Sequence, residues 1–188
     1  MCKTTIILGI GNIGQEYLKT RHNIGFDVVD AIVSKFGLNS TKELKNSTLH
    51  EVTILENRVL CIKPKTYVNL SGLALSEVLE NYSLDRESLL VVVDDFHLPL
   101  GRLRFRKRGS SGGHNGMKSL ISVVGEDFHR LRFGIGPLPE GVEITEFVLG
   151  RFSSDEHDLY NESLIRAVDG IKSYIQDGME NTMNRFNS

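Results

Sequence analysis

The sequence places a histidine, an acid pair and three asparagines in settings where such side chains do chemistry. His22 lies in Thr20-Arg21-His22-Asn23, shortly after a glycine-rich turn, and Asp94-Asp95 follows a run of apolar residues. A neutral imidazole can take a proton from water, and a carboxylate at its other nitrogen fixes the tautomer and stabilises the charged ring. Three amides in or beside glycine-containing segments could donate hydrogen bonds to an ester carbonyl and its oxyanion: Asn12, Asn69 and Asn115. Together these residues predict one site that activates water, with His22 as the base.

Each of these side chains also has a structural interpretation. A single histidine has many uses, an acid pair after a strand can be a solvated turn, and asparagines beside glycines are common in turns. The other five histidines show no metal-binding spacing such as H-E-x-x-H.

Gly9 to Gly14 matches the G-x-G-x-x-G pattern of dinucleotide-binding turns. That function requires a helix that opens inside the pattern, whereas residues 15–22 are polar and poorly periodic. The sequence therefore favours a tight glycine turn, which could also present Asn12 to a ligand. No nucleotide cofactor is expected.

Gly109 to Gly113 matches G-x-S-x-G, the nucleophile elbow of serine esterases, with Ser111 as the nucleophile. The elbow requires a sharp strand-to-helix turn, and here the helix is expected about four residues later. A glycine-rich loop that leads into a helix N-terminus is also a good anion site. We favour the anion site and keep the serine esterase as an alternative.

Basic side chains are concentrated before this loop. Residues 96–125 contain no acid, although the net charge of the chain is −2. The alternation through residues 102–106 puts arginines on one face of a strand and Leu103 and Phe105 on the other. Charges on an edge strand can serve only to prevent aggregation, but this density next to a glycine loop favours contact with phosphates.

Apolar periodicity predicts alternating strands and helices. The expected strands are residues 4–10, 51–56, 58–63, 89–93, 102–106 and 131–135, and the expected helices are 23–36, 73–82, 117–124, 155–175 and 180–186, with Asp85 capping a short turn. This order predicts an α/β fold with a largely parallel sheet. The length of 188 residues predicts a single domain.

Composition sets the cellular context. We see no signal peptide and no apolar run near the roughly 20 residues that span a bilayer, so a cytoplasmic protein is expected. The two cysteines, Cys2 and Cys61, form no disulfide or zinc pattern, and Cys61 is expected to be buried.

Four ordered blocks resemble the bacterial-type peptidyl-tRNA hydrolase family along essentially the whole chain. They are Gly9 to Gly25, with Asn12, Tyr17 and Thr20-Arg21-His22-Asn23; Pro64 to Gly72, with Asn69; Asp94 to Gly101; and Gly112 to Ser119, with Asn115. Each block alone is weakly specific, but the ordered set is highly specific.

The resemblance implies a single three-layer α/β/α catalytic domain, residues 1–188, with a twisted, mostly parallel mixed sheet. It implies a carboxylic ester hydrolase that frees tRNA from peptidyl-tRNA during translation, without metal, cofactor, membrane or obligate protein partner, as a monomer. His22 is then the base and Asp94 orients it. The implied substrate-binding residues are Asn12, Tyr17, Tyr67, Asn69 and Asn115. From the basic strand and its neighbours we expect the phosphate-binding residues to be Arg104, Arg106, Lys107, Arg108, Lys118 and Arg132.

Two positions depart from the pattern of the family. Ile13 replaces a proline, which loosens the turn because proline would fix φ, and Val68 replaces a methionine, which shortens an apolar wall of the cleft. The catalytic groups are all present. The alternative function is a non-catalytic RNA-binding protein on the same scaffold.

Overall fold

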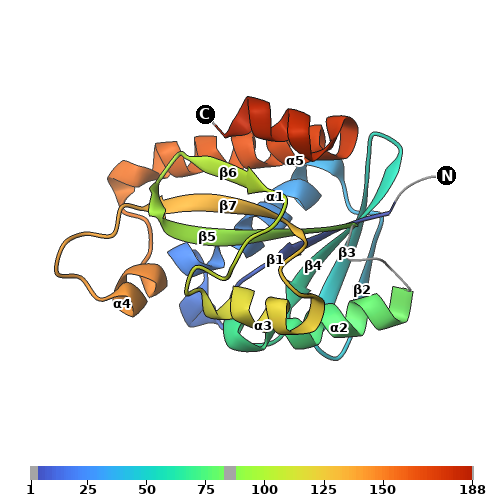
Figure 1. The fold of residues 1–188 in the computed structure, drawn as a ribbon, viewed down its shortest axis with the longest axis horizontal. Coiled ribbons are helices and arrows are strands. Elements are labelled where there is room, and N and C mark those ends of the chain that lie inside the picture. The colour runs from blue at the N-terminus through green and yellow to red at the C-terminus, as the bar shows by residue number, and fades with distance from the viewer. Residues whose placement is uncertain (1–3, 83–87, 188) are drawn as a thin grey trace.

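The sheet has strand order β2-β3-β4-β1-β5-β7-β6 (Figure 1). The computed structural model describes residues 4–82 and 88–187, so Cys2 and the predicted cap at Asp85 lie outside the described residues. The strands are β1 Thr5–Gly9, β2 Ser40–Glu43, β3 Ser47–Ile54, β4 Asn57–Pro64, β5 Leu89–Pro99, β6 Leu103–Arg106 and β7 His129–Gly136. The four central strands are parallel to one another, and the outer strands pair antiparallel.

Helices cover both faces of the sheet. They are α1 Ile24–Phe36, α2 Ser71–Tyr82, α3 Asn115–Val124, α4 Ile144–Leu149 and α5 His157–Phe186, and α5 bends at the non-helical Gly178. In Figure 1, α1 and α5 lie on one side of the sheet, α2 and α3 lie on the other, and α4 lies at one end. The predicted three-layer α/β/α fold with a mixed sheet is confirmed.

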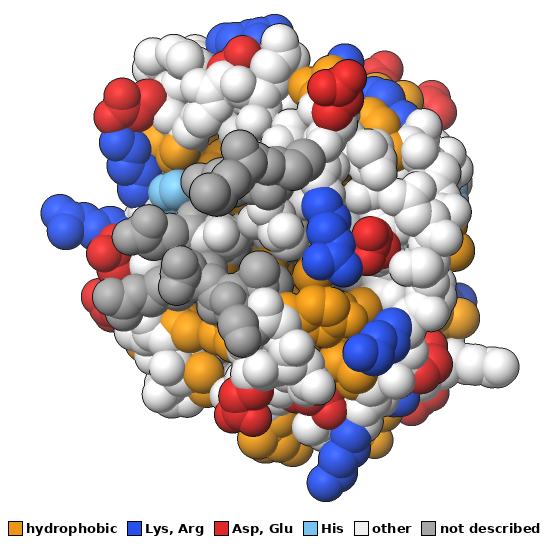
Figure 2. Space-filling view, turned by 90° about the vertical axis from the view of Figure 1, so that its right-hand side faces the viewer, with side chains coloured by type: hydrophobic (Ala, Val, Ile, Leu, Met, Phe, Trp, Pro, Cys, Tyr) orange, Lys and Arg blue, Asp and Glu red, His pale blue; other side chains and the backbone are white. Residues whose placement is uncertain are grey.

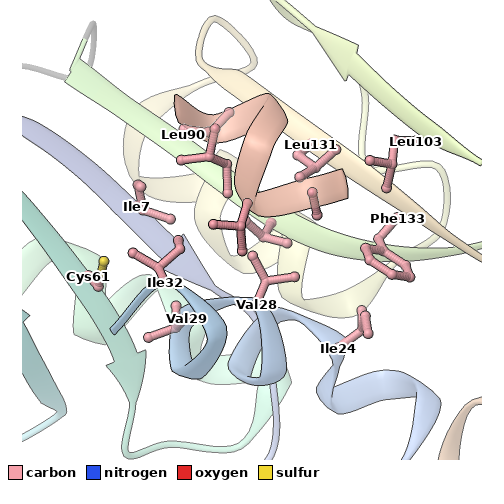
Figure 3. Close-up of a cluster of buried hydrophobic side chains, with 14 of the residues drawn as sticks. Ile7, Ile24, Val28, Val29, Ile32, Cys61, Leu90, Leu103, Leu131 and Phe133 are labelled. Carbon is pink, nitrogen blue, oxygen red and sulfur yellow. The ribbon is translucent and has the colours of Figure 1, made fainter. Parts of the chain in front are cut away.

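The central strands are apolar because they are buried on both faces. In β5, Leu90 and Val92 pack with α1 and α5, whereas Leu89, Val91 and Val93 pack with α2 and α3. Figure 3 shows the first of these clusters, where Val28 and Ile32 of α1 lie under the sheet side chains. The buried Cys61 belongs to this core, and burial raises the pKa of its thiol to about 12.

The structure corrects three expectations about the elements. First, β5 continues through the acid pair to Pro99, because Asp94 and Asp95 still pair with β7 before an irregularity. Second, the hairpin of β3 and β4 is longer than predicted. Third, β2 and α4 were not predicted: β2 is fully exposed and α4 buries only Val148, so neither has a clear apolar period.

The end of the molecule opposite α4 has a mixed surface. Figure 2 shows the end opposite α4, where acidic and basic side chains are interspersed over the surface. Among the described residues, no helix is both long and apolar enough to cross a membrane.

Candidate active site

The loop that carries His22 is held by a close approach of β1 to α1. A Cβ atom on Gly9 would lie 2.2 Å from the carbonyl oxygen of Gly25, so only glycine fits where the strand passes the helix. The side chain of Asn23 then closes the loop, since it accepts from Asn12 N over 2.8 Å and donates to Asn12 O over 2.9 Å. Asn23 was predicted near the cap of this helix, and it is the N-cap residue, but its side chain bonds Asn12 instead of the helix.

Arg21 anchors the same loop to the segment that contains α4. Its guanidinium makes two hydrogen bonds to Glu156, at 3.0 and 2.8 Å, and lies 4.6 Å from the ring centroids of both Phe147 and Phe152. Its backbone N–H donates to Gly150 O over 2.9 Å. The position of His22 is therefore tied to α4 through its neighbour.

His22 and His114 converge on Asp94. His22 Nδ1 lies 2.9 and 3.0 Å from the two carboxylate oxygens of Asp94, and His114 Nε2 lies 3.0 Å from Oδ1. Asp94 is buried and the two imidazole rings are partly buried, with their centroids 4.9 Å apart. The predicted pair of His22 and Asp94 is present in the geometry that a general base requires.

The start of α3 fixes the tautomer of His114. His114 is the N-cap of this helix, and its Nδ1 accepts from the N–H groups of Gly116 and Met117 over 3.1 and 3.3 Å. A nitrogen that accepts carries no proton, so the proton of His114 is on Nε2 and is donated to Asp94. Both ring nitrogens of His114 are therefore engaged, whereas His22 can gain a proton at Nε2 without losing a bond.

The electrostatics of the pair suit proton transfer. Burial lowers the pKa of His22, but the charge of Asp94 and the hydrogen bond to it outweigh burial, so the pKa is raised above its ordinary value. Burial raises the pKa of Asp94, but the two histidines outweigh it and hold the pKa far below its ordinary value. Asp94 is a carboxylate at neutral pH and stabilises a proton on His22.

His22, Asp94 and His114 are also the one group of potential metal ligands among the described residues, with ligand atoms within 4.8 Å of one another. A metal at His114 Nε2 would have to displace a proton while Nδ1 still accepts two N–H groups. That state is an imidazolate, so this donor set fits hydrogen bonding better than a metal. The expected absence of a metal stays a prediction.

Three amides line the same cleft as His22. The Oδ1 atom of Asn12 accepts from Val68 N over 2.9 Å, which leaves its NH₂ group for the cleft. The Oδ1 atom of Asn115 lies 3.3 Å from Lys118 Nζ, so its NH₂ group is also available. Asn69 is exposed at the same cleft.

A cleft of about 680 Å³ contains this constellation. Asn12, His22, Asn69, Asp94 and Asn115 all line it. The loop from Gly109 to Gly113 forms one wall, and Ile144, Thr145, Val148 and Leu149 of α4 form another. The sequence did not predict the α4 wall.

The predicted phosphate-binding residues are only partly at the cleft. Arg106, Arg108 and Arg132 line it, whereas Arg104, Lys107 and Lys118 do not. Lys107 forms an ion pair with Glu180, and Lys118 lines a second groove. Arg104 lies opposite Arg132 in the pairing of β6 with β7, so it continues the basic face.

Two arginines of β7 are engaged within the protein. Arg132 lies 2.6 Å from Asp95 Oδ2, a close ion pair without the alignment of a hydrogen bond. Arg130 is only 2 % exposed and donates to the carbonyl oxygens of Gly109, Ser110, Glu126 and Phe128. Arg130 therefore shapes the glycine loop and is not available to phosphate.

Other predicted residues lie outside the cleft. Tyr17 is half-buried and Tyr67 is exposed, and neither lines it. The helix after the first glycine motif begins only at Ile24, so that motif lacks the geometry of a dinucleotide turn. The helix after Ser111 begins at Asn115, and Ser111 Oγ accepts from Gly113 N over 3.4 Å, so the strand–serine–helix elbow is absent.

The comparisons with known proteins agree with this geometry. A model of the peptidyl-tRNA hydrolase family matches residues 6–188. The chain belongs to the peptidyl-tRNA hydrolase family. Curated peptidyl-tRNA hydrolases from Clostridium botulinum and Caldanaerobacter subterraneus are 40 % and 43 % identical, cover 97 % of this chain, and are themselves covered to 96 % and 98 %.

Solved structures of this peptidyl-tRNA hydrolase family share the fold. The crystal structure of peptidyl-tRNA hydrolase from Acinetobacter baumannii matches with a TM-score of 0.89 at 31 % identity, over 100 % of this chain and 96 % of the other. The resemblance inferred from the four sequence blocks is confirmed.

Sequence reasoning missed the role of His114, although the residue was noted within the Gly112 to Ser119 block. Two signals could have identified it. It directly precedes the helix that starts at Asn115, and a histidine at an N-cap has one nitrogen occupied and one free. Only the folded sheet shows that the free nitrogen meets Asp94.

Proposed function

We propose that this chain hydrolyses the ester between a peptide and the 3′ end of tRNA, with His22 as the general base. The observation that carries the proposal is the bond from His22 Nδ1 to the buried Asp94, which leaves Nε2 as the nitrogen available to the cleft. Neutral His22 takes a proton from water at Nε2 as the water oxygen attacks the ester carbonyl. Asp94 stabilises the imidazolium.

The tetrahedral intermediate carries a negative oxygen that needs donors. In Asn12 and Asn115 the Oδ1 atom is engaged by a donor within the protein, so the NH₂ group can donate to the negative oxygen. Asn69 lines the same cleft. The intermediate then expels the 3′ oxygen of the ribose, and His22 returns its proton to that oxygen. The products are a peptide with a free carboxyl group and tRNA with a free 3′ hydroxyl.

Arg106 and Arg108 are the best placed of the predicted phosphate contacts. Both line the cleft, and neither has an ion pair with another described residue. Arg104 and Arg132 extend the basic face, although Asp95 offsets the charge of Arg132. Contacts to phosphates position the RNA without reading the peptide sequence. Tyr17 and Tyr67 stay predicted substrate contacts, and Lys107 and Lys118 stay predicted phosphate contacts.

We expect the enzyme to act as a monomer in the cytoplasm, without a metal, a cofactor or an obligate protein partner. The direct test is release of peptide from peptidyl-tRNA by the purified chain in the presence of a chelator. The non-catalytic RNA-binding alternative predicts binding of the RNA without release of peptide. The Ser111→Ala variant should retain activity. Loss of activity in this variant would favour the alternative in which Ser111 is the nucleophile of a serine esterase.

A further inference from the structure

A second groove begins where the catalytic cleft ends. It has a volume of about 520 Å³ and lies between α2 and α3. Its lining residues are Asn69, Leu70, Gly72, Leu73, Asn115, Lys118, Ser119, Ser122 and Val123. Asn69 and Asn115 line both hollows, so the two meet at the proposed oxyanion amides.

The groove has an apolar rim. Leu70, Leu73 and Val123 are 45, 51 and 42 % exposed. Single exposed apolar side chains are ordinary, but several around one hollow indicate a binding surface. Exposed apolar surface at this position can be buried by a ligand that extends from the catalytic cleft.

The floor of the groove is closely packed. Gly72 N donates to Ser119 Oγ over 2.9 Å, and a Cβ atom on Gly72 would lie 2.5 Å from the carbonyl oxygen of Ser119. The helices α2 and α3 therefore touch here and cannot close further. A preformed hollow loses little conformational entropy when it binds a flexible chain.

The charges differ between the two hollows. The catalytic cleft is lined by four arginines and two aspartates, Arg106, Arg108, Arg130, Arg132, Asp94 and Asp95. Lys118 is the one charged side chain among the described residues that line the groove. Lys118 is also engaged with Asn115 Oδ1. The phosphate backbone of RNA binds best where several cations lie together. An apolar rim is better suited to the side chains of a peptide. The two parts of the substrate extend in different directions from the ester that joins them.

We propose that the groove between α2 and α3 binds the peptide part of peptidyl-tRNA, upstream of the esterified residue, and prefers apolar side chains there. The inference rests on the proposed function, because the ester must be at His22 for the peptide to reach the groove. A substrate with only one acylated amino acid is too short to occupy the groove.

The test compares two substrates that carry the same tRNA: N-acetyl-aminoacyl-tRNA and a tetrapeptidyl-tRNA with leucine at the upstream positions. The variant is Leu73→Ser combined with Val123→Ser, and the matched control is Ile165→Ser, an exposed position on α5. The variant should raise KM about tenfold for the tetrapeptide substrate with kcat nearly unchanged, because apolar binding of the remote chain is lost. The short substrate should change less than about twofold.

The outcomes separate the two proposals. Absence of hydrolysis with both substrates in the wild-type protein overturns the proposed function itself. An equal rise of KM with both substrates means that the groove holds RNA, and an unchanged KM with the tetrapeptide means that it holds neither; each overturns the peptide assignment. If the variant does not fold, the wild-type protein decides: glycine in place of leucine upstream should raise KM severalfold, and equal values overturn the proposal.

Discussion

His114 donates its Nε2–H to Asp94 Oδ1 over 3.0 Å, and the same oxygen lies 2.9 Å from His22 Nδ1. One histidine therefore orients the acid, and the acid orients the other histidine. The start of α3 fixes the first ring through two backbone N–H groups. The orientation of His22 thus depends on a helix that begins more than 90 residues later in the chain.

His114 should support activity and stability through different atoms. His114→Asn can still cap α3 but cannot reach Asp94, whereas His114→Ala loses both bonds. We expect kcat to fall about tenfold in both variants because Asp94 loses a donor that fixes it. Only His114→Ala should lose a further ~1 kcal/mol of unfolding free energy from the cap. Urea unfolding and steady-state kinetics give the two readouts, and wild-type kcat in His114→Asn would contradict the orienting role.

The pH dependence of hydrolysis should report on His22. The base must be neutral, so kcat/KM falls as the pH drops through the pKa of His22 in the free enzyme. That pKa is raised above 6.5, so the acid limb should lie above pH 6.5. The measurement is a pH profile of kcat/KM, and an acid limb below pH 6.5 would contradict the structure.

Asp94→Asn should move that limb to lower pH. The variant removes the charge that raises the pKa of His22 but keeps the burial that lowers it. The plateau rate should also fall, by about 10² or more, because an amide cannot stabilise the imidazolium and can favour the wrong tautomer. Loss of rate with an unmoved limb would show that another group titrates.

Arg106 should contribute to RNA binding in a salt-dependent way. A side chain that contacts one phosphate releases counterions, so Arg106→Ala should raise KM and reduce the slope of log kcat/KM against log salt by about 1. Arg58→Ala is the matched control, because Arg58 forms an ion pair with Glu51 across β3 and β4, away from the cleft. An equal slope in Arg106→Ala and the wild-type protein would remove Arg106 from the RNA interface.

Arg21 should be a large contributor to stability. Arg21→Ala leaves Glu156 without its bidentate partner and removes the cation from between two rings. The expected loss of unfolding free energy is about 3 kcal/mol. Lys35→Ala breaks the exposed pair with Asp169 and should cost about 0.5 kcal/mol. If urea unfolding showed equal losses of unfolding free energy in the two variants, the burial of Arg21 would contribute nothing to stability.

The sequence predicted the residues whose chemistry is local. Asp94 lies within β5, and Asn12, His22, Asn69 and Asn115 lie in or beside glycine-containing segments. Parallel strands bring such segments to one edge of a sheet, and all five residues line one cleft. The fold class followed from the same alternation of strands and helices. These inferences need no knowledge of long-range register.

Other features depended on register and on packing. Arg106 and Arg130 are direct cross-strand partners, yet Arg106 lines the cleft half-exposed, whereas Arg130 is buried under the glycine loop. Their pairing puts both side chains on the same face of the sheet, but the sequence does not show that the glycine loop covers Arg130. The α4 wall was missed for a related reason, since six residues with one buried side chain carry little periodicity.

The most direct test of His22 as the general base is a single-turnover measurement of peptidyl-tRNA hydrolysis by His22→Ala. Loss of the general base should lower the rate of the chemical step by about 10²–10⁴, while binding of the substrate changes little because Arg106 and Arg108 remain. Far-ultraviolet circular dichroism of the same preparation confirms the fold. A chemical step as fast as that of the wild-type protein would contradict the assignment of His22 as the base.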